Sequence, residues 1–254
     1  MLFRQYLQPE TGCASYLFGC TGTARAVAVD VLPNAVRPML DILDLSGMHC
    51  VAVVETHLQA DHVSAGRDLA ARTGAPYVAH HAAPLAFPFA AAHNGDRIDA
   101  GNVQVTIWET PGHSDDSLAL LVTDRTRADE PWVVLTGDTL LVGDAGRPDL
   151  HGEANAAQLA SMLYDSLQRL SALPDYVAVY PSHFAGSVCG RALSATPAST
   201  IGFERRHNAA LAPRTREELI RFMLHDLPEE PPDFARMRLV NRGLPPAATV
   251  PTTA

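Results

Sequence analysis

Short apolar runs alternate with stretches of helical periodicity along the first half of the chain. The runs at 14–20, 24–31 and 49–56 are rich in apolar residues and end at polar or turn residues, a pattern typical of strands. The segments 35–47 and 64–74 carry apolar residues at helical spacing, and both end in glycine. We therefore expect the order strand, strand, helix, strand, helix at the start of the fold.

The second half of the chain first repeats the strand pattern and then becomes helical. Further strands are expected at 76–80, 103–110, 117–124, 131–138 and 176–183. Helices are expected at about 154–173, 199–208 and 215–226. This order favours an α/β fold in which helices cover the outer faces of sheets. No repeat or break in composition marks a second domain, so we expect residues 1–254 to form one catalytic domain. A helical and proline-rich C-terminal extension is expected from about residue 192.

Composition and charge exclude several classes of protein. The 254 residues are 47% hydrophobic and carry a net charge of −9, with the positive charges scattered, which argues against nucleic acid or an anionic membrane as a partner. No apolar run approaches the ~20 residues of a membrane span, and the N-terminus lacks the apolar core of a signal peptide. The four cysteines have no C-x-x-C spacing and are expected to be free thiols. These features favour a cytoplasmic protein.

Histidine and aspartate cluster at the ends of four predicted strands. The clusters are HLQADH (57–62), PGHSDDS (111–117), GDT (137–139) and PSH (181–183). A single histidine after a strand is usually an ordinary loop residue, but four such clusters are hard to obtain by accident. Strand ends are where rigid folds present functional groups, and imidazole and carboxylate are the usual ligands of zinc and non-haem iron. We therefore expect a metal site.

These clusters carry a family resemblance. The segment THLQADH resembles the signature H-x-H-x-D-H of the metallo-β-lactamase superfamily, and TPGHSDDS, TGDTLLVGD and YPSH resemble its next three motifs in order. The resemblance covers roughly residues 10–190 and implies a four-layer αβ/βα sandwich with the metal at one edge of two sheets. Within the superfamily, LLVGDAGRPDL and HFAGSVCGR are most similar to persulfide dioxygenases and their neighbours, the glyoxalase II hydrolases.

One departure from the signature separates these two relatives. Glyoxalase II-like enzymes hold two metals, and the third signature position, here Gln59, supplies an imidazole to the first of them. A neutral amide oxygen is a poor replacement for that imidazole. The resemblance assigns the remaining hydrolase ligands to His57 and His113 for the first metal, to Asp61, His62 and His183 for the second, and to Asp138 as the bridge.

The persulfide dioxygenases use a smaller set of ligands. The resemblance implies one ferrous iron per chain on His57, His113 and Asp138, and all three residues are present. Asp61, His62 and His183 would then be catalytic groups that orient ligands and water, unless they hold a second metal. We therefore favour the dioxygenase over a zinc hydrolase of thioesters, with a non-catalytic member of the fold as a third reading.

The resemblance also implies the substrates. A dioxygenase of this kind oxidises a small thiol persulfide, such as glutathione persulfide, with dioxygen to give sulfite and the thiol. Arg147 and Arg191 are candidates for binding substrate carboxylates, although either would equally suit a structural role. Cys189 is a candidate for sulfur handling or a small buried core residue. Relatives are often homodimers, but no residue of the sequence identifies an interface.

Overall fold

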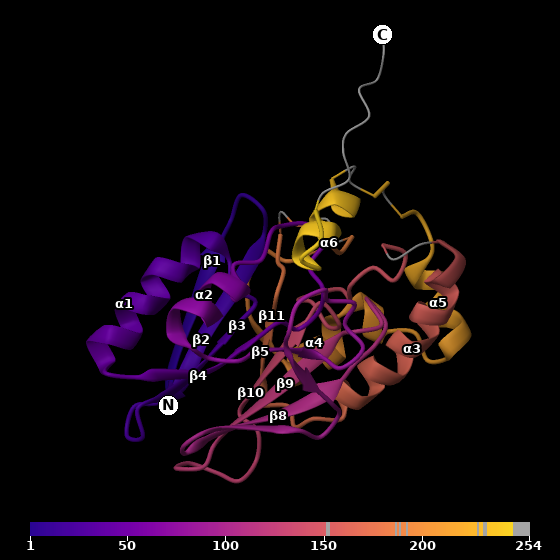
Figure 1. The fold of residues 1–254 in the computed structure, drawn as a ribbon. Coiled ribbons are helices and arrows are strands. Elements are labelled where there is room, and N and C mark those ends of the chain that lie inside the picture. The colour runs from indigo at the N-terminus through magenta and orange to yellow at the C-terminus, as the bar shows by residue number, and fades with distance from the viewer. Residues whose placement is uncertain are drawn as a thin grey trace.

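Two six-stranded β-sheets face each other at the centre of the protein, as Figure 1 shows. The computed structural model describes residues 1–150, 153–185, 187, 189–191, 193–227, 229–230 and 233–245. The two sheets take their strands from successive parts of the chain, six from each. The fold is therefore built from two consecutive sheet-forming halves.

The first sheet has the order β1-β2-β3-β4-β5-β6. Its first three strands are antiparallel to one another, and the remaining neighbours are parallel. Parallel neighbours need a crossover connection, which helices α1 and α2 supply around β4. The strands are β1 (Leu2–Gln8), β2 (Cys13–Cys20), β3 (Arg25–Val29), β4 (His49–Val54), β5 (Tyr77–His80) and β6 (Ala90–Ala92).

The second sheet has the order β12-β11-β10-β9-β8-β7. Only β10 and β11 are parallel, and helix α3 makes the crossover between them. The strands are β7 (Arg97–Ala100), β8 (Val103–Glu109), β9 (Leu118–Asp124), β10 (Val133–Gly137), β11 (Ala178–Pro181) and β12 (Ser199–Thr200).

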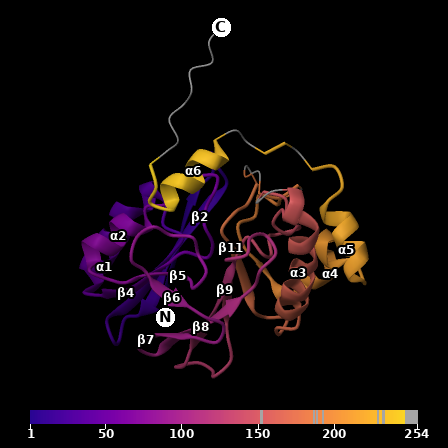
Figure 2. The same ribbon diagram turned by 45° about the vertical axis from the view of Figure 1, so that its right-hand side comes forward.

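Helices cover the outer faces of both sheets, so the fold has four layers. Figures 1 and 2 show α1 and α2 against the first sheet and α3, α4 and α5 against the second, while α6 lies over one end of the sandwich near α2. The expected αβ/βα sandwich is confirmed. The helices are α1 (Val36–Ser46), α2 (Gly66–Thr73), α3 (Glu153–Ser171), α4 (Ile201–His207), α5 (Arg216–Met223) and α6 (Phe234–Asn241), with 3-10 turns η1 (Pro33–Ala35) and η2 (Ala209–Leu211).

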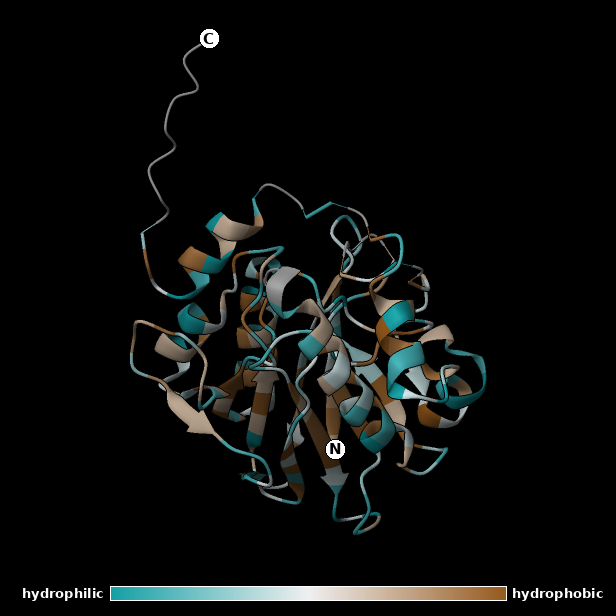
Figure 3. Cartoon of the chain, turned by 90° about the vertical axis from the view of Figure 1, so that its right-hand side faces the viewer, coloured by the Kyte–Doolittle hydropathy of each residue, from teal (hydrophilic) through white to brown (hydrophobic). Residues whose placement is uncertain are grey.

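The alternation of side chains along the strands fills three apolar layers. In β2, Tyr16 and Phe18 pack between the sheets, whereas Leu17 packs outward with Met39 of α1. On the other side, Leu163 and neighbouring residues of α3 pack on the outer face of the second sheet. Figure 3 shows the apolar strands enclosed by helices whose outer faces are polar. The fully buried strands hold the loops at their ends in fixed positions.

The sequence missed four strands and one helix. Within the described residues, the strands that were not predicted are β1, β6, β7 and β12, which are short or only half-buried and so have weak patterns. Helix α6 lies in the C-terminal extension, beyond the last helix that was expected, at 215–226. All four cysteines are free, as predicted, and the structure buries each of them. Among the helices of the described residues, none is both long and apolar enough to cross a bilayer.

Candidate metal centre

Loops after four strands bring the clustered residues to one edge of the sandwich. His57 follows β4, His113 follows β8, Asp138 follows β10 directly, and His183 follows β11. Gly146 packs against this group, and its N–H donates to the Asp138 carbonyl at 2.9 Å. A Cβ at position 146 would lie 2.1 Å from that carbonyl oxygen and 2.9 Å from Nδ1 of His113. Only glycine allows this close approach.

Two imidazoles converge on one carboxylate oxygen. Oδ2 of Asp138 lies 3.8 Å from Nε2 of His57 and 3.6 Å from Nε2 of His113. The two imidazole rings meet edge-on, with centroids 4.9 Å apart, and all three side chains are buried. The donor atoms lie within 4.8 Å of one another. Two imidazoles and a carboxylate on one side of a metal are the donor set that suits non-haem iron with open positions.

Nδ1 of each imidazole has a hydrogen-bond partner of its own. Nδ1 of His113 lies 2.9 Å from the Arg147 carbonyl oxygen, which can only accept, so Nδ1 carries the hydrogen. Nδ1 of His57 lies 2.9 Å from the Thr56 hydroxyl, which donates to Asp30 and therefore accepts from His57. Nε2 is therefore the nitrogen that each ring directs toward Asp138. This is the orientation that partners behind metal-binding histidines impose.

The protonation states also suit a metal. Burial lowers the pKa of His57 to about 3, so its imidazole is neutral near pH 7. Burial by itself would raise the pKa of Asp138, but the neighbouring His183 outweighs that effect and the pKa is lowered. Metal binding requires neutral imidazole and ionised carboxylate. Both states are therefore present before any ion arrives.

His183 lies between two carboxylates. Its Nδ1 donates to Asp138 at 2.7 and 2.8 Å, and its Nε2 lies 2.8 Å from Oδ2 of Asp61. Burial opposes a charge on His183, but these carboxylates raise its pKa well above the usual value. His62 donates Nδ1–H to Asp61 at 3.0 Å, and this contact outweighs burial and raises the His62 pKa to about 10. A row of alternating charges thus leads away from Asp138.

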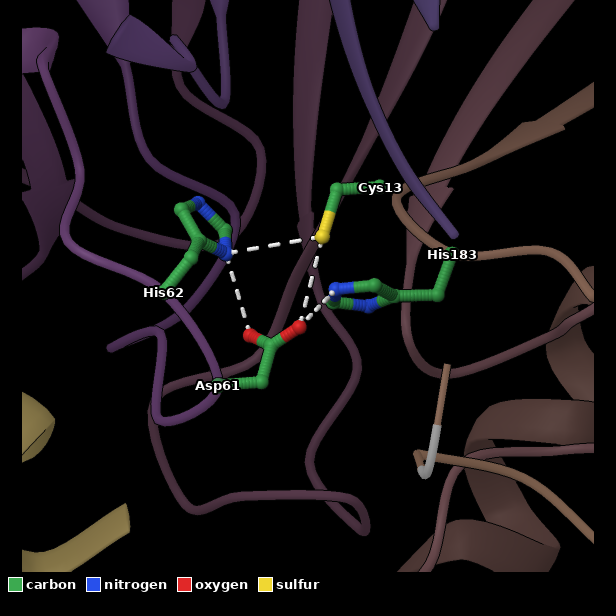
Figure 4. A group of neighbouring side chains, drawn as sticks. All are labelled: Cys13, Asp61, His62 and His183. Carbon is green, nitrogen blue, oxygen red and sulfur yellow. Dashed lines mark hydrogen bonds and ion pairs between the residues drawn. The ribbon is translucent and has the colours of Figure 1, made fainter. Parts of the chain in front are cut away.

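Cys13 is part of this second group, as Figure 4 shows. Its Sγ lies 3.4 Å from Oδ2 of Asp61 and 3.8 Å from Nδ1 of His62. Its backbone pairs with His183, so the start of β2 reaches the site from the first sheet. The sequence did not indicate this position, because Cys13 belongs to no motif and its partners lie far along the chain.

A family model now places the site in context. The model of the metallo-beta-lactamase superfamily matches residues 9–183. The chain belongs to this superfamily. The match ends at His183, so it includes His57, His113 and Asp138 as well as Asp61 and His62. The resemblance seen in the sequence motifs is thereby confirmed.

Individual superfamily members resemble the chain to different extents. The crystal structure of ETHE1 from Myxococcus xanthus is 32% identical with a TM-score of 0.80, and the match covers 95% of this chain and 98% of that one. A metallo-beta-lactamase from Staphylococcus aureus is 30% identical with a TM-score of 0.88, over 95% of this chain and 72% of that one.

A third relative is a hydrolase. The hydroxyacylglutathione hydrolase of Polaromonas sp. is 32% identical over 173 residues, or 66% of this chain. The match spans 61% of that hydrolase's own length. These relatives place the protein in the superfamily. Which reaction it catalyses has to be inferred from the residues of the site.

Gln59 is the one departure from the superfamily signature, and its surroundings are unusual. The side chain is 1% exposed, yet neither its Oε1 nor its Nε2 has a hydrogen-bond partner among the described residues. A buried amide without partners is costly, so buried polar groups generally have one. An amide in this state can take a water or a bound ligand as its partner.

Replacement of Gln59 by Ala should leave the metal content of the protein nearly unchanged. The triad of His57, His113 and Asp138 is complete without position 59, and removal of an amide that has no partner breaks no hydrogen bond within the described residues. Metal analysis of the purified variant measures this, with Gln59→His as the companion. The histidine variant should take up additional zinc, because it completes the two-metal signature. Loss of iron from Gln59→Ala would contradict a triad that is sufficient by itself.

The three candidates for substrate contacts lie in different places. Arg147 is 0% exposed, pairs with Asp149 at 2.7 Å, and reaches the triad through its carbonyl behind His113. Cys189 is brought beside Asp138 and His183, and burial raises its pKa to about 12, so it is a thiol near pH 7.

Arg191 makes its contacts with residues outside the triad. Its guanidinium pairs with Asp144 at 2.9 Å and lies 4.1 Å over the ring of Phe222. These contacts tie the loop after β11 to helix α5. The structure therefore groups Cys189 with the triad, places Arg147 behind it, and gives Arg191 partners on another element.

Proposed function

We propose that the protein is a persulfide dioxygenase that uses one ferrous iron held by His57, His113 and Asp138. Its substrates are a small thiol persulfide, such as glutathione persulfide, and dioxygen, and its products are sulfite and the thiol. The observation that carries the proposal is a complete two-histidine, one-aspartate triad beside Gln59, where a two-metal hydrolase would use a third imidazole. ETHE1 is a persulfide dioxygenase, and its similarity to this protein over nearly the whole of both chains supports the same function.

The reaction balances with the substrates named. A persulfide, dioxygen and water yield thiol, sulfite and two protons. The S–S bond breaks, and the two sulfur atoms together lose the four electrons that one dioxygen gains. Ferrous iron, when bound, supplies a redox-active centre with open coordination positions. The protein itself contributes the neutral imidazole of His57, the ionised carboxylate of Asp138 and a site whose three ligand side chains are buried.

The row of charges beside the triad has a role in orientation and proton handling. His183 donates Nδ1–H to Asp138 and so fixes the direction of that carboxylate. Its Nε2 faces Asp61, which in turn is fixed by Nδ1–H of His62. We assign to Nε2 of His183 the delivery of the proton that the product thiol requires, because this buried nitrogen lies beside the triad and faces Oδ2 of Asp61 at 2.8 Å.

Hydrolysis of thioesters is the second candidate function. The observation that favours it is the close grouping of Asp61, His62 and His183, whose donor atoms lie within 4.8 Å of one another and could hold zinc. The Polaromonas hydrolase is similar over two thirds of this chain. Gln59 counts against this function, because the first metal would lose an imidazole ligand.

An oxygen electrode separates the two functions. The purified protein should consume one dioxygen for each sulfite formed when glutathione persulfide is added, and it should not hydrolyse S-lactoylglutathione under argon. A protein heated until unfolded serves as the blank, because persulfides also oxidise without enzyme. Thioester hydrolysis without oxygen uptake would replace the dioxygenase with the hydrolase.

A further inference from the structure

A single side chain from helix α6 is hydrogen-bonded to the loop that contains Asp61 and His62. Nδ2 of Asn241 donates to the carbonyl of Gln59 at 2.9 Å and to the carbonyl of His62 at 2.8 Å. Oδ1 of Asn241 accepts from the N–H of Ser64 at 2.9 Å. The amide of Asn241 thus makes three hydrogen bonds to the backbone of one short loop.

These bonds have the features of a specific contact. They join residues that are 177 to 182 positions apart, and Asn241 is 7% exposed, so water competes poorly for the same groups. An asparagine has two donors and one acceptor oxygen in a fixed planar arrangement. Both donors and the acceptor are used here, which fixes the loop in position as well as in orientation.

Packing alone does not hold this part of α6 against the fold. A cavity of about 340 Å³ lies beside the contact, bounded by Val240 and Asn241 of α6 and by Arg67 and Tyr77 of the first half of the chain. The apolar contact of α6 is at its other end, where Phe234 packs with Ala60 and Leu150. The hydrogen bonds of Asn241 therefore attach the C-terminal turn to this loop, while Arg242 attaches the same turn to the segment around Pro84 and Ala86.

We propose that Asn241 is a positioning residue that holds Asp61 and His62 in register with His183. The inference rests on the proposed function, in which these three residues orient the triad and handle a proton. Asn241 holds the loop at the carbonyls of Gln59 and His62, on both sides of Asp61. These two bonds restrict movement of Asp61, whose Oδ2 lies 2.8 Å from Nε2 of His183. The tail of the chain is thereby part of the active centre.

The test replaces Asn241 with Leu, which has a similar volume and none of the three hydrogen bonds. The matched control is Arg238→Gln on the same helix, which removes the bond from Arg238 to the Leu150 carbonyl and leaves the loop untouched. Measured on iron-loaded protein with glutathione persulfide, kcat of Asn241→Leu should fall about 10- to 100-fold. KM and iron content should stay within about twofold of the wild type, because the triad is intact. Arg238→Gln should lower the melting temperature without a comparable fall in kcat.

Other results have defined meanings. An unchanged kcat in Asn241→Leu, or an equal fall in both variants, would overturn the proposal, since the helix would then act only through general stability. If Asn241→Leu does not fold, Asn241→Asp takes its place, because it keeps the shape and the acceptor and loses the donors. If the wild type proves to be a two-metal hydrolase, loss of one metal from Asn241→Leu would support the positioning role while the dioxygenase fails.

Discussion

Replacement of Asp138 by Asn is expected to abolish stable iron binding and to lower dioxygenase activity at least about 1000-fold. Asp138 supplies the only carboxylate of the triad, and its Oδ2 is the point on which His57 and His113 converge. An amide is close in shape but carries no charge and is a weak ligand. A 1000-fold fall in rate corresponds to the loss of about 4 kcal/mol of transition-state stabilisation, which the bound metal would supply. Iron content and oxygen uptake measure the two effects.

The matched control for this variant lies in the neighbouring motif. Asp115 is exposed and two residues from His113, so Asp115→Asn removes the same charge without touching the triad. It should retain iron and activity. Full iron content in Asp138→Asn would show that the metal sits elsewhere.

Replacement of His183 by Gln is expected to lower kcat about 10- to 100-fold while the iron stays bound. In the structure His183 faces carboxylates with both ring nitrogens, Asp138 on one side and Asp61 on the other. Its loss leaves the triad ligands in place, but Asp138 loses the donor that fixes its direction. The pair of measurements is kcat with glutathione persulfide and iron per chain.

An exposed histidine provides the comparison. His225 pairs with Asp226 on the surface, and His225→Gln should change neither quantity. If the metal content of His183→Gln falls in parallel with kcat, His183 is itself a metal ligand. That result would favour the two-metal hydrolase.

The strong patterns in the sequence predicted both the layers of the fold and the composition of the triad. Strands such as β2 and β10 are buried on both faces, so their apolar runs are unambiguous, and polar residues that follow them must lie at an edge. Asp138 could be placed in this way before any contact was known. The superfamily motifs then specified which histidines accompany it.

The partners of the site were beyond the reach of sequence patterns. Cys13 opens a buried strand and looks like any core thiol until β2 is paired with the segment around His183. Asn241 lies in a tail that reads as irregular, because α6 buries only Phe234 and Asn241 and so has almost no apolar stripe. Both contacts depend on tertiary structure between residues far apart in the chain.

The metal content of wild-type protein purified without chelator tests the central claim most directly. A single ferrous site on His57, His113 and Asp138 predicts about one iron per chain and little zinc, with oxygen uptake in proportion to the iron present. Two zinc ions per chain, together with activity that does not depend on iron, would contradict it.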